Sequence, residues 1–286
     1  MYQKIQTQGL AILVFVILFL TTTNVLADTE KQYKSHIAYT DHGKGKPIVL
    51  IHAFPTDQRL WMPQEEVLRS FFRVITLDLW GFGQSSPTHG QAMDMNQYAD
   101  EVKQLLDDLN LHKAVIGGES MGGYIALAFL KKYPDRVSGL ILSDTQAIAD
   151  TDAMKEKREQ LAQMVLEQGP TQLVNDFVKH ALWKDDDLIE ERQFLKDIVE
   201  SQTAHAIASA LRGMALREDT ESVLEATSLP ILILTGDKDV IVSPQQSENM
   251  HQLAKNSKLV VIKDAGHLSN LDQPERWNQA VIDMFE

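Results

Sequence analysis

The chain has 286 residues, of which 44% are hydrophobic and 23% are charged, a composition typical of folded globular proteins. Its formal net charge of −13 argues against nucleic acids and anionic membrane surfaces as partners. Because the sequence contains no cysteine, disulfides, thiolate catalysis and cysteine-ligated metals are excluded.

The first 27 residues have the layout of a secretory signal peptide: Lys4 gives a positive start, residues 10–20 are apolar, and small residues precede the end of the segment. As a helix the apolar run would cover only about half of a ~30 Å hydrocarbon core. We therefore expect cleavage near Ala27 and a periplasmic or secreted mature protein that begins at residue 28. An uncleaved N-terminal anchor is the alternative.

Short apolar runs then alternate with helix-like segments up to residue 146. The run at 47–51 is apolar throughout, which is typical of a strand buried on both faces of a parallel sheet. The predicted strands are 34–39, 47–51, 73–77, 113–116 and 137–142. The predicted helices are 63–70, 93–109 and 124–132.

From residue 147 to 226 the pattern is helical throughout, with helices predicted at 151–167, 171–182, 186–201 and 204–218. Strands then resume at 230–234 and 258–262, with helices at 244–254 and 274–285. This alternation predicts an α/β protein with a mostly parallel, doubly wound sheet. The sheet would be built by residues 28–146 and 227–286, and residues 147–226 would form an inserted, all-helical cap.

A Gly-x-Ser-x-Gly motif centred on Ser120 lies between a predicted strand and a predicted helix. Gly118 and Gly122 flank the serine, as a sharp turn between these elements requires. Such a turn lifts the hydroxyl above the sheet edge and points the first N–H groups of the helix at the group it attacks. The alternative is a glycine-rich turn with a bystander serine.

The residues that nucleophilic acyl transfer needs follow other predicted strands, and the carboxyl ends of parallel strands meet at one edge of a sheet. His267 follows the last strand and can act as general base and acid, while Asp239 follows the strand before it and can orient the imidazole. The backbone N–H groups of Phe54 and Met121 can form an oxyanion hole. The chain order Ser, Asp, His is typical of one fold.

Several of these positions have competitors. Asp237 can be a turn aspartate, and Asp144 can replace Asp239 as the acid. His267 can be a surface histidine, and His52 is a poor base because its motif organises the oxyanion loop. The remaining histidines show no metal-ligand spacing: His36, His42, His89, His112, His180, His205 and His251.

Over residues 34–286 the chain resembles the α/β-hydrolase superfamily. The resemblance is carried by its H-G-x-P loop at 52–55, its D-x-x-G-x-G-x-S turn at 78–85, its nucleophile elbow at 118–122, its acid loop at 236–239 and its histidine loop at 265–267. It is nearest to small carboxylesterases and enol-lactonase-like hydrolases with a four-helix cap.

Three positions refine this resemblance. Ala53 replaces the usual glycine of the oxyanion loop, which narrows the allowed backbone angles. Trp80 stands where arginine is frequent, which puts an inherited carboxylate-binding role in question. Ser120 excludes the dehalogenase and epoxide hydrolase chemistry of this fold, because that chemistry needs an aspartate nucleophile.

The resemblance implies a serine hydrolase that cleaves a small carboxylic ester or lactone through an acyl-enzyme, with neither a cofactor nor a metal. The signal-peptide layout adds that the enzyme is exported and contacts the membrane only through the signal peptide before cleavage, and the negative net charge argues against a nucleic acid partner. The alternatives are a ligand-sensing protein with slow turnover, or perhydrolase or haloperoxidase activity with the same catalytic triad.

Overall fold

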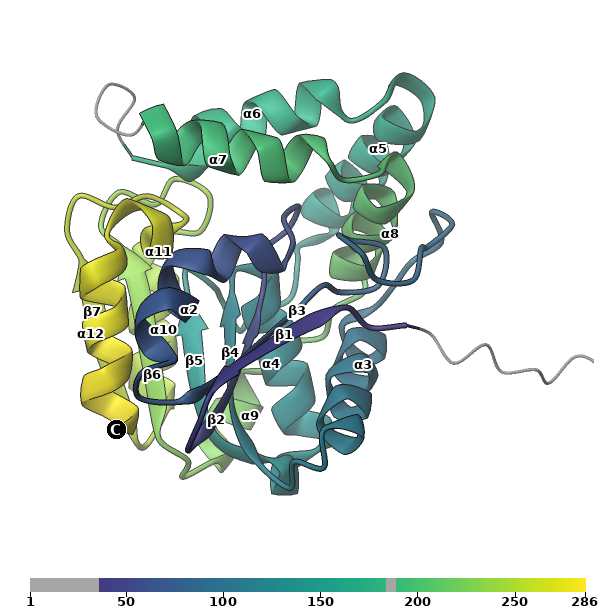
Figure 1. The fold of residues 1–286 in the computed structure, drawn as a ribbon. Coiled ribbons are helices and arrows are strands. Elements are labelled where there is room, and N and C mark those ends of the chain that lie inside the picture. The colour runs from purple at the N-terminus through teal and green to yellow at the C-terminus, as the bar shows by residue number, and fades with distance from the viewer. Residues whose placement is uncertain (1–35, 184–188) are drawn as a thin grey trace, which may run out of the picture. The chain divides into compact units, whose positions relative to one another are not determined.

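The computed structural model of the protein describes residues 36–183 and 189–286 (Figure 1). The chain divides into two units, Met1–His36 and Ile37–Glu286, and the second contains all the elements described below. The predicted signal peptide, residues 1–27, lies outside the described residues. Within the described ranges, no helix has the length and apolar character needed to cross a bilayer.

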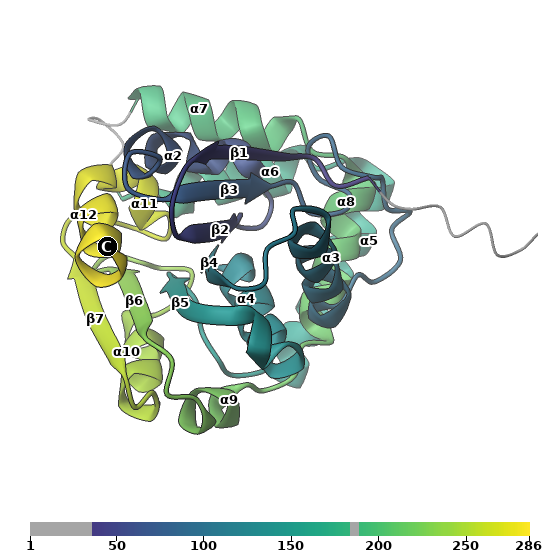
Figure 2. The ribbon, with the colours of Figure 1, turned by 60° about the horizontal axis from the view of Figure 1, so that its bottom comes forward.

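A seven-stranded sheet forms the centre of the second unit, with the strand order β1-β3-β2-β4-β5-β6-β7 (Figure 2). Five neighbouring pairs of strands are parallel, and β1 with β3 is antiparallel. This architecture confirms the predicted fold class. The strands are β1 (Tyr39–Gly43), β2 (Pro47–Ile51), β3 (Arg73–Leu77), β4 (Ala114–Glu119), β5 (Val137–Ser143), β6 (Ile231–Gly236) and β7 (Ser257–Ile262).

Successive side chains of each buried strand enter different hydrophobic clusters. In β2, Val49 and Ile51 pack with residues of α3 and α4, whereas Ile48 and Leu50 pack with residues of α2 and α12. Because side chains alternate between the faces of a strand, a strand that is apolar throughout supports a helical layer on each face. This explains why β2 reads as an uninterrupted apolar run.

The helices that the sequence predicted around the sheet begin and end close to their predicted bounds. α3 begins with a capping box, in which Asp94 accepts from Gln97 N and the Gln97 side chain accepts from Asp94 N. The helices around the sheet are η1 (Gln58–Trp61), α2 (Met62–Leu68), α3 (Met95–Asp108), α4 (Met121–Lys132), η2 (Pro134–Arg136), α9 (Glu221–Ala226), α10 (Pro244–Leu253), α11 (Ser269–Asp272) and α12 (Pro274–Phe285).

Four helices between β5 and β6 form a helical insertion, which we define as α5–α8. α5 packs against α8 and α6 packs against α7, and the second pair lies across the top of Figure 1. The insertion consists of α5 (Asp152–Gln168), α6 (Thr171–Ala181), α7 (Ile189–Glu200) and α8 (Ala204–Ala215). The next helix, α9, packs instead against α4 and α10. Cap boundaries at residues 147 and 226 stay predictions.

The prediction of a first strand at 34–39 was wrong at residues 36–38, which are not in a strand; β1 begins at Tyr39 and continues to Gly43 instead. Pairing with β3 determines which residues form β1. Arg73 Nε and Nη2 donate to the two carboxylate oxygens of Asp41 across the pair, at 2.9 and 2.6 Å. Polar cross-strand partners therefore stabilise a strand that has no apolar run.

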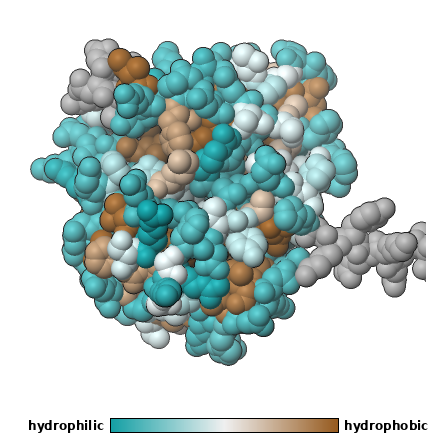
Figure 3. Space-filling view, viewed as in Figure 1, coloured by the Kyte–Doolittle hydropathy of each residue, from teal (hydrophilic) through white to brown (hydrophobic). Residues whose placement is uncertain are grey.

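The side of the molecule seen in Figure 3 is mainly hydrophilic, with hydrophobic residues in separate groups between the polar ones. This distribution agrees with the charged fraction of 23% and the formal net charge of −13.

Candidate active site

Ser120 occupies the turn between β4 and α4 with φ 53° and ψ −111°. Positive φ is uncommon for a residue with a side chain and costs about 1–3 kcal/mol, so the surroundings must hold it. Ser120 N donates to Ser143 O at 2.8 Å, and Ser120 O accepts from Thr145 Oγ1 at 2.7 Å. The serine backbone is therefore fixed on both sides of its side chain.

Close backbone packing explains the two flanking glycines. A Cβ at Gly118 would lie 2.0 Å from Gly122 C, and a Cβ at Gly122 would lie 2.2 Å from Ile51 O and 3.0 Å from His52 O. No side chain fits at these separations. The first turn of α4 therefore rests directly on the backbone that leads from β2 into the predicted oxyanion loop, residues 52–55.

The structure brings Ser120, His267 and Asp239 together. His267 Nε2 lies 2.8 Å from Ser120 Oγ, and His267 Nδ1 lies 2.9 Å from Asp239 Oδ2. The three residues are 8%, 1% and 6% exposed, in the order Ser120, His267, Asp239. Because a carboxylate only accepts, Nδ1 donates its hydrogen to Asp239 and Nε2 is free to accept the serine O–H.

Asp239 is itself held by the backbone, since its Oδ1 accepts from Ile241 N at 2.8 Å and Val242 N at 2.9 Å. Its charge acts on the histidine. Burial lowers the pKa of His267, but the negative charge of Asp239, the hydrogen bond that His267 donates to it and the charge of Asp144 outweigh burial and raise this pKa overall. The site therefore stabilises the protonated, positively charged form of the His267 imidazole.

The predicted oxyanion loop is tied down by its own polar groups. Ala53 O accepts from His52 Nδ1, Thr56 N and Thr56 Oγ1, at 2.8–2.9 Å, and His52 Nε2 accepts from Leu79 N at 3.1 Å. Burial lowers the pKa of His52 more than the nearby carboxylates raise it. With both ring nitrogens engaged, this histidine organises the loop that carries Phe54.

The structure also accounts for Ala53 and Trp80, the two departures from the family pattern. Ala53 is not among the described residues with positive φ, so its methyl group brings no backbone strain. Trp80 N donates to Oε2 of the buried Glu101 at 3.1 Å. The backbone at position 80 is therefore fixed by a buried carboxyl group.

Asp144, the alternative acid, lies in a different place from Asp239. Its Oδ1 accepts from Gly236 N at 2.7 Å, and its Oδ2 accepts from the N and Oγ of Ser269. Burial and the charge of Asp239 raise its pKa to about 6. These contacts connect the loop that carries Asp239 with the loop that carries His267. Asp144 therefore supports the site by holding these two loops together.

Asp237, the other competitor, lies at a turn. It accepts from Asp264 N at 2.8 Å and pairs with Lys238 at 3.0 Å, so it stabilises the loop. His267 is buried, which rules out the alternative that it is a surface histidine.

Sequence reasoning missed Glu119, which directly precedes Ser120 and is fully buried. Burial and the charge of Asp144 raise the pKa of Glu119 well above its ordinary value. Asp144 and Ser143 are its polar neighbours, but neither carboxyl oxygen has a hydrogen bond of ordinary geometry in the described structure. A charged residue at the end of an otherwise apolar strand was the signal that could have identified it.

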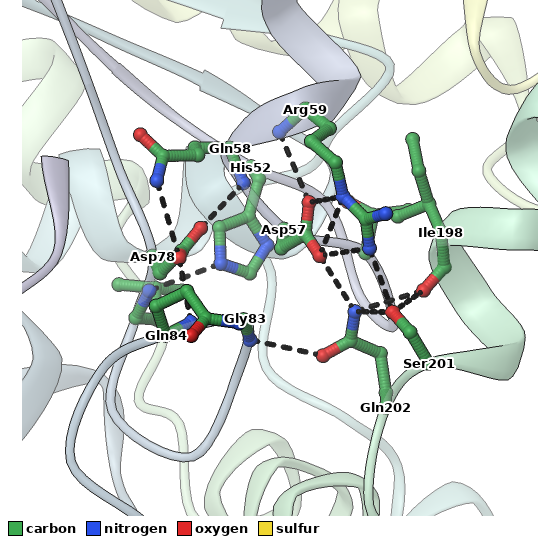
Figure 4. A network of polar contacts seen from close by, with 12 residues as sticks. His52, Asp57, Gln58, Arg59, Asp78, Gly83, Gln84, Ile198, Ser201 and Gln202 are labelled. Atoms are coloured by element: carbon green, nitrogen blue, oxygen red, sulfur yellow. Dashed lines mark hydrogen bonds and ion pairs between the residues drawn. The ribbon is translucent and has the colours of Figure 1, made fainter. Parts of the chain in front are cut away.

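A polar network built on the buried residues His52, Asp57 and Asp78 lies beside the oxyanion loop (Figure 4). Asp57 pairs with Arg59, whose Nη2 lies 2.7 Å from Asp57 Oδ2. Asp78 accepts from Gln58 N at 2.9 Å and Gln84 N at 2.8 Å. Gln202 from the helical insertion completes this network, and no pattern in the sequence pointed to it.

No group of three or more His, Cys, Asp or Glu side chains in residues 36–183 and 189–286 is arranged to hold a metal ion. We therefore assign no residue of these ranges to a metal site.

Comparison with known proteins agrees with this architecture. The chain is 38% identical to a thermophilic esterase from Thermogutta terrifontis whose structure was solved with malate bound, with a TM-score of 0.84 and coverage of 89% of this chain and 94% of that chain. It is 32% identical over 240 residues to 3-oxoadipate enol-lactonase 1 of Acinetobacter baylyi, covering 81% of this chain and 85% of the enzyme.

It also matches the dihydrolipoyllysine-residue acetyltransferase component of the acetoin cleaving system of Pseudomonas putida, at 29% identity over 83% of this chain but only 63% of that protein's length. The family profile described as alpha/beta hydrolase fold matches residues 46–274. The chain therefore belongs to the alpha/beta hydrolase superfamily, in its esterase and lactonase-like branch.

Proposed function

We propose that the protein is a serine hydrolase that cleaves carboxylic esters or lactones. One observation carries the proposal: a continuous chain of hydrogen bonds joins Ser120 Oγ, both ring nitrogens of His267 and Asp239. In such a chain the imidazole can take the serine proton while the carboxylate holds the ring and stabilises its charged form. The similarity to an esterase and an enol-lactonase supports the same substrate class.

In the proposed reaction, Ser120 Oγ attacks the substrate carbonyl carbon as His267 Nε2 removes the hydroxyl proton. The tetrahedral intermediate collapses, the C–O bond to the alcohol breaks, and His267 returns the proton to the leaving alkoxide. Water then attacks the acyl-enzyme with His267 as the base, and the acid leaves Ser120. In a lactone the alcohol and the acid belong to one product.

The N–H groups of Phe54 and Met121 would bind the oxyanion, each contributing about 2.7–4 kcal/mol. Two observations support this role. Met121 is the first residue of α4, where backbone N–H groups have no helical partner. The contact of Gly122 with Ile51 O and His52 O brings the start of α4 against the loop that carries Phe54.

The test is hydrolysis of p-nitrophenyl acetate and a panel of lactones, with a fluorophosphonate probe to identify the nucleophile by peptide mapping. We expect steady turnover, labelling of Ser120, and loss of both in Ser120→Ala. A label on another residue would overturn the site. A single burst of product without turnover would instead indicate the slow ligand-sensing alternative.

We further propose that the protein is exported and processed near Ala27. The apolar run at residues 10–20, which follows Lys4 and precedes small residues, supports this localisation. Mass spectrometry of the native protein should give a mature chain that begins at residue 28. An intact N-terminus in the membrane fraction would favour the uncleaved anchor.

A further inference from the structure

Gln202 lies at the junction of α7 and α8, and its side chain leaves the helical insertion to enter the network around the oxyanion loop (Figure 4). It is 4% exposed. Its Nε2 donates to Asp57 Oδ2 and to Ile198 O, both at 2.8 Å, and its Oε1 accepts from Gly83 N at 3.1 Å. Donor and acceptor of the amide are therefore both used.

Asp57 links this amide to the oxyanion loop, because it lies three residues after Phe54. Its carboxylate accepts from Arg59 N and pairs with the Arg59 guanidinium. Thr56, which directly precedes Asp57, donates to Ala53 O through both its N–H and its hydroxyl. A shift of the Asp57 carboxylate would therefore move the backbone that carries Phe54 N–H.

Gly83 links the same amide to the neighbouring loop. It has φ 52°, and a Cβ there would lie 2.2 Å from Asp78 Oδ2, so the loop packs tightly around Asp78. Asp78 in turn accepts from Gln58 N, directly after Asp57. One side chain of the insertion thus bridges the two loops that surround His52.

A second hydrogen bond connects the same two segments, residues 57–59 and residues 201–202. Arg59 Nη2 donates to Ser201 Oγ at 2.7 Å, so Asp57 and Arg59 meet consecutive residues at the end of α7. Of these two contacts, the hydrogen bond from Gln202 to Asp57 is buried and charge-assisted, whereas the bond from Arg59 to Ser201 is exposed. Buried, charge-assisted hydrogen bonds contribute more than exposed ones, so the Gln202 contact is the stronger connection between the insertion and the oxyanion loop.

We propose that Gln202 is a positioning residue that fixes Phe54 N–H at the place where the oxyanion forms, so that the oxyanion hole depends on the position of the helical insertion. This inference rests on the proposed function. An oxyanion donor is effective only within about 0.5 Å of its required position. Since the donor acts on charge that develops during the reaction, losing it lowers kcat and leaves substrate binding unchanged.

The experiment compares Gln202→Leu with the wild-type protein, since leucine fills the buried site without replacing the hydrogen bonds. We expect kcat for p-nitrophenyl acetate and the rate of fluorophosphonate labelling of Ser120 to fall together by about 10- to 100-fold, as expected for hydrogen bonds that involve a charged group. KM should stay within about twofold of wild type.

Gln193→Leu is the matched control. Gln193 is an exposed residue of α7, the helix that precedes Gln202, and its side chain donates to Asp197 Oδ1 at 2.6 Å, so the same substitution there should leave both rates unchanged. Should Gln202→Leu fail to fold, Gln202→Asn withdraws the amide by one methylene group and is expected to lower both rates in the same way.

Rates are normalised to folded protein by circular dichroism. Wild-type kcat and labelling rates in the folded variant would overturn the inference, as would a change in KM alone. Absence of ester turnover by the wild type would contradict the proposed function, but the labelling rate would still decide the role of Gln202, because labelling needs only the nucleophile and the oxyanion donors.

Discussion

Three buried carboxyl groups, those of Asp239, Asp144 and Glu119, belong to the surroundings of Ser120 and His267, and their environments differ. Asp239 accepts from two backbone N–H groups and from His267. Asp144 accepts from Gly236 N and from Ser269, while Glu119 has no hydrogen bond of ordinary geometry. Burial and the charge of Asp144 raise the pKa of Glu119 well above its ordinary value, so the site favours the neutral form of the carboxyl group that lacks such hydrogen bonds.

The first prediction concerns His267, which must be neutral to accept the serine proton. Because its pKa is raised above 6.5, kcat/KM should fall as the pH drops through a value above 6.5. Asp239→Asn removes the charge that raises this pKa, so burial should then move the midpoint to lower pH, and the rate should fall by about 10⁴-fold. A pH–rate series for both proteins tests this, and identical midpoints would contradict it.

The second prediction concerns Glu119→Gln, which replaces a buried carboxyl group by a neutral amide of the same shape. A group with a raised pKa binds a proton in the folded state that it loses in the unfolded state. Stability therefore falls as the pH rises from the unfolded pKa towards the folded one. Thermal unfolding at pH 5 and pH 8 should show a smaller loss of Tm in the variant than in wild type.

Glu66→Gln is the control for this measurement, because Glu66 is exposed and its substitution should leave the pH dependence of Tm as in wild type. An equal loss of Tm in Glu119→Gln and wild type would show that Glu119 does not titrate differently in the folded protein.

At the scale of elements, the turn from β4 to α4 depends on backbone-to-backbone packing. At Gly117, inside β4, an added Cβ would meet the end of the Leu50 side chain at 2.8 Å, but at Gly118 it would meet the Gly122 carbonyl carbon at 2.0 Å. A side-chain end can move, whereas the backbone of the first helical turn cannot move without displacing Ser120.

The third prediction follows from this contrast. Gly118→Ala should lower the free energy of unfolding by more than the roughly 1–3 kcal/mol typical of overpacking, and it should abolish fluorophosphonate labelling. Gly117→Ala should fold with a smaller loss of stability and keep its labelling. Urea denaturation and labelling of both variants check the order, and equal effects would contradict the packing argument.

At the scale of the whole molecule, the two ends of the helical insertion are joined by a buried ionic cluster. Asp150 precedes α5 and Arg217 follows α8, and Arg217 Nη1 lies 2.6 Å from Asp150 Oδ1. Arg158 of α5 pairs with the same carboxylate. The cluster therefore connects the segment in which the chain leaves β5 with the segment in which it returns towards β6.

The fourth prediction is that Asp150→Ala lowers the free energy of unfolding by about 3–5 kcal/mol, since it leaves two guanidinium groups without their carboxylate. Burial raises the pKa of Asp150, but the hydrogen bond and charge of Arg158 and the charge of Arg217 outweigh burial and lower this pKa. The stabilisation is therefore present above the unfolded pKa and disappears as the pH falls through the folded one.

Urea denaturation at pH 7 measures this effect, with Asp107→Ala as the control. Asp107 pairs with Lys103 and Arg136 at the surface, so its loss should cost less than about 1 kcal/mol. Equal losses in the two variants would show that the cluster at Asp150 does not hold the insertion.

The sequence by itself determined the parts of this protein that depend on neighbours along the chain. The apolar run at 47–51 identified β2, because a strand buried on both faces is apolar along its whole length. The motif at Ser120 and the ends of the last two strands indicated where Asp239 and His267 would meet it, since parallel strands end at one edge of the sheet.

Only the tertiary structure decided the contacts between segments that are remote in the chain. Pairing with β3 placed β1, and the hydrogen bonds of Asp144 joined Gly236 to Ser269. Gln202 reached Asp57 across 145 positions. Such partners leave no local pattern, because nothing in the sequence around a polar residue between two helices shows whether the fold will bury its side chain.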